Sequence, residues 1–140
     1  MNSGRSGIDY EDLLDIQDST LSGVDYVGGD VVVVRLAPAY VHRSEGRPGI
    51  DRGSGWLLDI DLVIRAGVVE CSPLKMPCWL ADGSITIGDT NWNNCVPIPL
   101  AASGMVTLYA ITENSERLVI RGTGVESVSR RELRYVEESP

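Results

Sequence analysis

The chain has 140 residues, of which 43% are hydrophobic and 23% are charged, a balance typical of globular rather than disordered proteins. Its 20 acidic and 12 basic residues give a net charge of -8, which disfavours nucleic acids and anionic membrane surfaces as partners. This length fits one domain, which we expect to span residues 8–140 after a flexible tail at 1–7.

The N-terminal segment contains neither the cationic start nor the apolar stretch of a signal peptide, and no apolar run reaches the roughly 20 residues that cross a bilayer. We therefore expect a cytoplasmic protein. The three cysteines, Cys71, Cys78 and Cys95, are an odd set without a CxxC spacing, and the chain has one histidine. This composition argues against a zinc site and favours small buried thiols, so we predict neither a metal nor a cofactor.

Residues 8–16 carry the one apolar spacing in the chain that favours a helix. Tyr10, Leu13 and Leu14 fall on one helical face, and Asp9 is a suitable cap. We therefore predict at most one short N-terminal helix, with an extended edge segment as the alternative.

From Thr20 onward the pattern favours strands. The Gly-Gly pair at 28–29 accepts the positive φ angles of a tight hairpin turn. The run 31–34 is all valine, and such stiff, β-branched side chains suit a pleated sheet. Because this run is apolar on both faces, we predict that 31–36 is a central strand with a bend at Pro38.

A polar, glycine-rich loop is predicted at 43–55, which is long for a domain of this size. The region 56–65 then shows the clearest alternation in the chain. One of its faces carries Leu58, Ile60, Leu62 and Ile64. This pattern is typical of a strand with one dry and one wet face, and Gly67 indicates a turn or bulge after it.

Short polar or glycine-bearing segments mark the later turns. The Asp-Gly pair at 82–83 predicts a hairpin, as do the polar segments 113–116 and 129–131, and the glycines within 122–124 predict a bulge. Strands separated by such turns indicate a mainly β fold. We predict a single-domain antiparallel β-sandwich, with a β-barrel as the alternative.

His42, the single histidine, is the first candidate for chemistry. A carboxylate such as Glu45 or Asp51 could orient it as a general base, with Arg43 beside it. The alternative is a histidine at the rim of the fold that packs on its own strand. No GxSxG motif supplies a nucleophilic serine, and no cysteine has a convincing partner, so we predict no catalytic residue.

Asp59 and Asp61 form the second candidate. Two positions apart on a strand, they share one face at a spacing of roughly 7 Å. Paired carboxylates can bind a ligand or divide acid and base roles, whereas the alternative is a solvated sheet face. If that face is covered, the carboxylates need cationic partners, for which Arg35 and Arg65 are available.

The third candidate is the polar segment around Trp92. The spacing of Asp89, Asn91 and Asn93 imitates the start of a calcium-binding loop, but the segment lacks the glycine and the glutamate that an EF-hand requires later in the loop. Two interpretations remain. The loop presents an aromatic ring among amides to a sugar or peptide, or Trp92 folds back onto the core.

The pattern Gly104-x-Val106-x-Leu108 near the C-terminus resembles small bacterial β-domains, a resemblance that implies no activity. The main functional hypothesis is a non-catalytic domain that binds another protein. One version is an immunity-like protein whose acidic surface neutralises a basic toxin. The alternatives are a small-ligand or enzymatic pocket around His42 and the nearby carboxylates, and a homo-oligomeric structural module.

Overall fold

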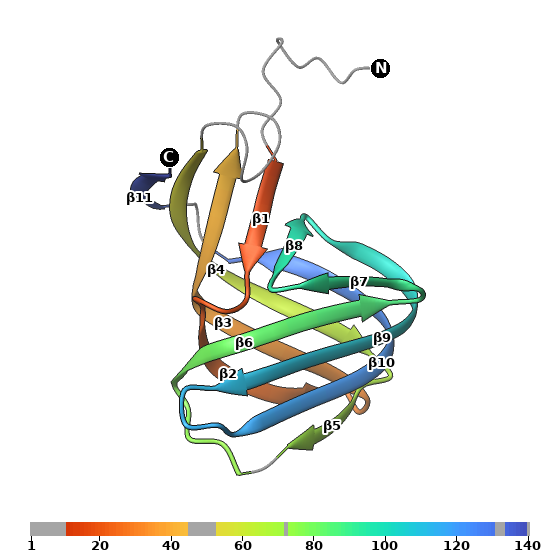
Figure 1. The fold of residues 1–140 in the computed structure, drawn as a ribbon. Coiled ribbons are helices and arrows are strands. Elements are labelled where there is room, and N and C mark those ends of the chain that lie inside the picture. Colours follow the sequence, from red (N-terminus) through yellow and green to blue (C-terminus); the bar gives the residue numbers. More distant parts are fainter. Residues whose placement is uncertain (1–10, 45–52, 72, 131–133, 140) are drawn as a thin grey trace, which may run out of the picture.

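The computed structural model describes residues 11–44, 53–71, 73–130 and 134–139, which form an antiparallel, 11-stranded sheet without a helix (Figure 1). In chain order the strands are β1 (Glu11–Asp15), β2 (Thr20–Val27), β3 (Val31–Ser44), β4 (Gly53–Arg65), β5 (Val68–Cys71), β6 (Cys78–Ile87), β7 (Thr90–Asn93), β8 (Cys95–Ile98), β9 (Ala101–Thr112), β10 (Arg117–Ser129) and β11 (Arg134–Ser139). The predicted mainly β, antiparallel fold is confirmed. Within these ranges, no helix is long and apolar enough to cross a membrane.

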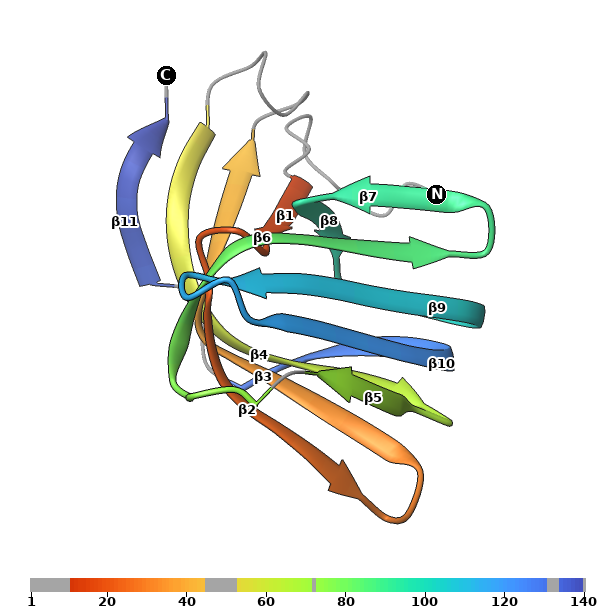
Figure 2. The ribbon, with the colours of Figure 1, turned by 60° about the horizontal axis from the view of Figure 1, so that its bottom comes forward.

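The sheet curls so that two layers face each other across the core. Its strand order is β11-β4-β10-β9-β6-β2-β3-β1-β8, with β5 paired to β10 and β7 paired to β6. Figure 2 shows β6, β9 and β10 in one layer and β2, β3 and β4 in the other. An additional pairing between β3 and β4 joins strands that lie far apart in this order. The arrangement is therefore sandwich-like, with its two layers connected by strand pairing.

The core consists of the inward-facing residues of both layers. The predicted alternation in β4 is confirmed, because Leu58, Ile60, Leu62 and Ile64 are all buried. The segment 31–36 is also confirmed as a central strand, since it pairs with β2 on one side and β4 on the other. Burial of these apolar side chains is the main stabilising contribution in such a fold.

A bulge in β3 keeps apolar residues on the inside after the strand bends. The β3 residues in the core cluster are Val32, Val34 and Leu36 before the bend and Ala39 and Val41 after it. The set facing the core thus changes from even to odd positions, which requires one extra residue in the strand. The register with β4 shifts between Leu36 and Ala39, around the predicted bend at Pro38.

The helix predicted for 8–16 is not present in the part of that segment that the structure describes. Residues 11–15 form β1, which pairs with β3 on one side and β8 on the other. Leu14 is fully buried, with an exposed fraction of 0%, and Asp15 points to the opposite face. Pairing on both edges outweighs a weak helical spacing, as tertiary context commonly does over five residues. The predicted tail at 1–7 lies outside the described residues.

The hairpin predicted at 82–83 is wrong, because both residues lie inside β6. The register between β6 and β9 shifts between Leu80 and Asp82, so the pair marks a bulge. Gly83 is buried, and a Cβ there would lie 3.0 Å from the Cβ of Ile16. The glycine therefore permits close approach of a second segment and does not form a turn.

Most other predicted turns are confirmed. Residues 28–29 connect β2 to β3 with φ angles of 65° and 92°, and residues 113–116 connect β9 to β10. A bulge lies between Gly122 and Gly124 as predicted. The segment 129–131 does not join a hairpin, because β11 pairs with β4 and not with β10.

Candidate functional site

A cleft of about 270 Å³ lies beside the bulge in β3. It is lined by Ser22, Arg35, Leu36, Ala37, Asp59, Ile60, Asp61 and Arg130. Two interruptions of regular pairing meet here, because β2 shifts its register between Leu21 and Gly23 close to the bulge in β3. On the other edge of β4, the pairing with β10 ends at Ile60 and the pairing with β11 begins at Leu57. The cleft thus lies where three strands leave regular pairing with their neighbours.

Charged side chains of both signs surround this cleft. Asp61 lies between two arginines, with its Oδ1 3.8 Å from Nε of Arg35 and its Oδ2 3.7 Å from Nη1 of Arg130. Asp59 accepts a hydrogen bond of 3.2 Å from Nη2 of Arg134. Arg35, which the sequence offered as a partner for these carboxylates, fills that role. Arg65 instead donates to the carbonyl oxygen of Ala102.

The ion pair between Arg35 and Asp61 is open. A separation of 3.8 Å is too long for a hydrogen bond, and both Nε of Arg35 and Oδ1 of Asp61 are buried without a hydrogen-bond partner among the described residues. Buried donors and acceptors are ordinarily paired. The wall of the cleft therefore holds one donor and one acceptor that a third group could satisfy together, provided that the two shielded side chains move apart to admit it.

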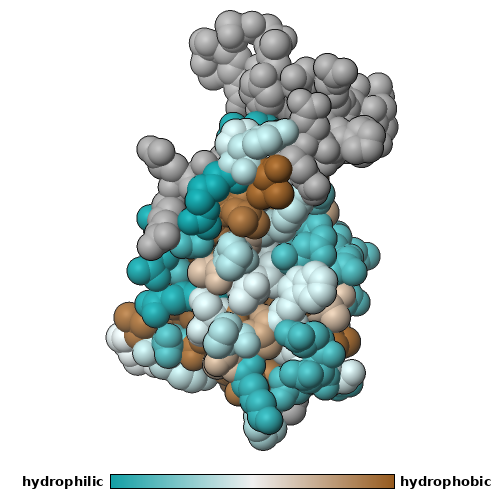
Figure 3. All heavy atoms as spheres, turned by 90° about the vertical axis from the view of Figure 1, so that its left-hand side faces the viewer, coloured by the Kyte–Doolittle hydropathy of each residue, from teal (hydrophilic) through white to brown (hydrophobic). Residues whose placement is uncertain are grey.

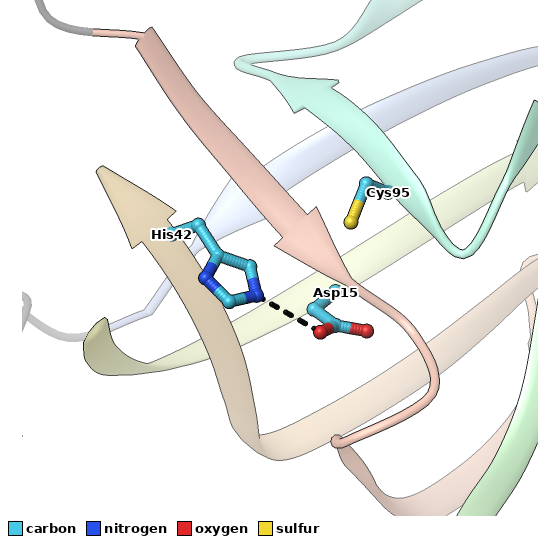
Figure 4. A group of neighbouring side chains, drawn as sticks. All are labelled: Asp15, His42 and Cys95. Atoms are coloured by element: carbon cyan, nitrogen blue, oxygen red, sulfur yellow. Dashed lines mark hydrogen bonds and ion pairs between the residues drawn. The ribbon is translucent and has the colours of Figure 1, made fainter. Parts of the chain in front are cut away.

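A second polar cluster lies on β1, β3 and β8, where Asp15, His42 and Cys95 point toward one another (Figure 4). Nε2 of His42 lies 3.0 Å from Oδ2 of Asp15. One nitrogen, sulfur or oxygen atom from each of the three residues lies within 4.8 Å of the others. That separation brings the three side chains close enough to share one metal ion.

Sheet register brings these three residues together. β1 lies between β3 and β8, and its residue Asp15 is directly opposite Cys95 in the pairing with β8. In the pairing with β3, Asp15 is opposite Tyr40, so His42 is its diagonal neighbour on the same face. Opposite and diagonal side chains on one face of a sheet lie within reach of each other.

The cluster is partly buried, and the carboxyl group of Asp18 lies near that of Asp15. Asp15 has an exposed fraction of 8%, and its Oδ1 has no hydrogen-bond partner in the part of the chain that the structure describes. Burial, the charge of Asp15 and a side-chain hydrogen bond with Asp15 raise the pKa of the nearby Asp18. Burial, with smaller contributions from Asp15 and Asp18, raises the pKa of Cys95 to about 11.

Of the other residues predicted near His42, the structure describes Arg43. Arg43 binds Asp12 through two hydrogen bonds, of 2.8 Å from Nε and 3.0 Å from Nη2, and lies 5.3 Å from the ring centroid of Trp56. This arrangement ties β3 to β1 and β4. Glu45 and Asp51 lie outside the described residues.

The segment 89–93 forms a hairpin with β6. Asp89 lies in the turn, and Asn91 and Asn93 are exposed on β7. Trp92 is half-buried and packs against the core, as one of the two interpretations expected. The side chains of this segment do not line the cleft described above.

The sequence singled out His42, Asp59 and Asp61 as candidates but did not identify Asp15 and Cys95, which lie beside His42. Asp15 had been assigned to a helix, and Cys95 had been interpreted as a buried thiol. Comparison with protein-family models, curated proteins and solved structures found no match to this chain. Inferences about function therefore depend on the geometry of the cleft and the cluster.

Proposed function

We propose that the protein binds a small hydroxylated molecule, such as a sugar or another polyol, in the cleft between β2, β3 and β4. The observation that carries this proposal is the open pair of Arg35 and Asp61, whose facing donor and acceptor are buried without hydrogen-bond partners among the described residues. The sequence analysis considered a small-ligand pocket around His42 and the nearby carboxylates. The cleft proposed here uses Asp59 and Asp61 from that set, and His42 does not line it.

Hydrogen-bond chemistry supports a hydroxylated ligand. A hydroxyl group donates one hydrogen bond and accepts others. Once the side chains of Arg35 and Asp61 move apart, one hydroxyl can accept from Nε of Arg35 and donate to Oδ1 of Asp61. A purely anionic group would satisfy Arg35 but would be repelled by Asp61. The hydroxyl of Ser22, which donates to the carbonyl oxygen of Arg35, adds another polar group at the cleft wall.

The balance of charge supports a neutral ligand. Asp59 and Asp61 lie opposite Arg35, Arg130 and Arg134, and Asp25 lies 3.6 Å from Arg35. Among the described residues, three carboxylates thus face three guanidinium groups. The face in Figure 3 is also hydrophilic or intermediate over most of its area, with apolar residues in small separate groups.

The test is an amide NMR titration with glucose, myo-inositol and glycerol, with glutamate and inorganic phosphate as charged probes. We expect saturable shifts of amides near Arg35 and Asp61 for at least one hydroxylated probe, at a Kd of about 1 mM or below. Asp61→Asn should weaken binding about tenfold, because the charge is lost and one of the two acceptor oxygens is replaced by an NH2 donor. The control Asp89→Asn changes an exposed turn residue and should not weaken binding.

Two outcomes would contradict the proposal. One is the absence of saturable shifts with every hydroxylated probe. The other is binding of phosphate or glutamate alone, which would make the cleft an anion site. A protein partner, self-association and a cytoplasmic location remain predictions, and co-purification with size-exclusion light scattering tests the first two.

A further inference from the structure

We propose that Asp15, His42 and Cys95 bind one divalent transition-metal ion of the zinc class. This site is separate from the cleft, since none of the three residues lines it. The sequence argued against zinc because the chain lacks a CxxC motif and has one histidine. The cluster needs neither a CxxC motif nor a second histidine. Its three ligands are one thiol, one imidazole and one carboxylate from three neighbouring strands.

The types of ligand atom favour zinc. Zinc binds sulfur, nitrogen and oxygen ligands, and sites with three protein ligands commonly keep a fourth position for water. Calcium and magnesium prefer oxygen ligands, so a thiol and an imidazole disfavour them. The exposed carboxyl group of Asp18 lies near Asp15 but is not one of the three clustered groups, so the fourth position is left to water.

The distances fit a tetrahedral site after a small adjustment. Ligand atoms at the usual zinc bond lengths lie roughly 3.3–3.6 Å apart. The nitrogen of His42 and the oxygen of Asp15 are 3.0 Å apart, and the sulfur of Cys95 lies within 4.8 Å of both. A metal ion between them therefore requires the first pair to open by a few tenths of an ångström and the sulfur to approach by at most about 1.2 Å.

Charge and burial provide an independent argument. The carboxylate of Asp15 is buried, its Oδ1 has no hydrogen-bond partner among the described residues, and Asp18 adds a second carboxyl group nearby. Buried anionic groups require compensation by a cation or a proton. A divalent ion bound to one carboxylate, one thiolate and a neutral imidazole gives a net charge of zero.

The same three residue types also occur in cysteine-based catalytic triads, but the geometry differs here. In a triad, the two ring nitrogens of histidine face the acid and the nucleophile separately. Figure 4 shows the nitrogen of His42 nearer Cys95 bound to Asp15, and the other nitrogen on the far side of the ring.

The test uses chelator-treated protein titrated with Co²⁺ and then with Zn²⁺. We expect one Co²⁺ per chain, a thiolate-to-cobalt charge-transfer absorption band, and loss of that band as Zn²⁺ displaces Co²⁺. Cys95→Ser should abolish the band, and His42→Gln and Asp15→Asn should each weaken binding at least about 100-fold. The matched control is Cys71→Ser, which removes an exposed thiol and should leave the band unchanged.

A second measurement uses the unmodified chain and does not depend on the folding of any variant. Zn²⁺ should slow alkylation of Cys95 at least tenfold, as measured by mass spectrometry, without slowing alkylation of Cys71. The proposal is overturned if the unmodified chain binds no Co²⁺ or Zn²⁺, if the band survives in Cys95→Ser, or if Zn²⁺ protects both thiols equally. Binding should persist in Asp61→Asn, which separates this result from that of the cleft.

Discussion

The cleft and the β1 cluster both carry carboxylates on the face of the sheet opposite the core, but they balance charge differently. In the cleft, Asp59 and Asp61 face arginines, which keep their charge at any ordinary pH. At the cluster, the basic group in contact with Asp15 is His42, whose charge depends on pH. The cleft is therefore suited to a neutral polar ligand, whereas the cluster is suited to a cation.

The largest expected effects come from the core that supports both regions. Leu14 lies beside Asp15 on β1 with its side chain on the buried face, and Ile60 lies between Asp59 and Asp61 on β4. Leu14→Ala and Ile60→Ala should each lower the free energy of unfolding by about 3 kcal/mol, because a buried aliphatic side chain is replaced by a cavity. Urea denaturation should show one transition in each variant. Two separate transitions would mean that the regions do not share one core.

Zinc should raise the free energy of unfolding through the cluster and not through the cleft. At a free Zn²⁺ concentration of 100 times the Kd, binding to the folded state should raise the free energy of unfolding by about 2.7 kcal/mol. Asp15→Asn should lose this gain, and Asp61→Asn should keep it. Urea denaturation with and without a chelator measures both effects. An equal gain in the two variants would place the metal elsewhere.

Cys78, a thiol outside the cluster, should make the free energy of unfolding depend on pH. Burial, with smaller contributions from Glu116 and Glu113, raises the pKa of Cys78 above its ordinary value of 9.0. Above that pH the unfolded chain loses this proton more readily than the folded chain, so the free energy of unfolding should fall as pH rises. Urea denaturation between pH 8 and pH 10 should show the fall, with a shallower slope in Cys78→Ala. An identical slope in that variant would contradict this assignment.

The smallest effects should come from ion pairs. Asp61 has a side-chain exposure of 15% and lies between two arginines, whereas Glu70 pairs with Arg121 at an exposed site. We expect Asp61→Asn to cost about 1 kcal/mol and Glu70→Gln about 0.3 kcal/mol, because solvent screens the exposed pair. Urea midpoints measure both costs. A larger cost for Glu70→Gln would show that the cleft ion pairs contribute little to stability.

The sequence predicted features that depend on neighbouring residues along the chain. The alternation of Leu58 and Ile60 identified a half-buried strand, and the glycines at 28–29 identified a turn. The hairpin predicted at 82–83 was wrong because the role of Gly83 depends on Ile16, which approaches it from another segment. A dipeptide carries no information about such a contact.

The candidate sites depend even more on contacts between segments that are distant in the chain. The spacing of Asp59 and Asp61 placed both on one face, but the sequence did not identify which arginines would approach them. Asp15, His42 and Cys95 are widely separated in the chain and meet only through the register of β1 with β3 and β8. A one-residue slip in either pairing would turn one side chain to the other face, and no local pattern specifies that register.

The central claim is that the chain carries two separate polar sites with different ligand chemistry. The most direct test is one amide NMR titration, in which Zn²⁺ is added first and a hydroxylated probe second. Zinc should shift amides around Asp15, His42 and Cys95, and the probe should then shift a different set around Arg35 and Asp61. Overlapping sets, or a failure of zinc to shift the first set, would contradict the claim.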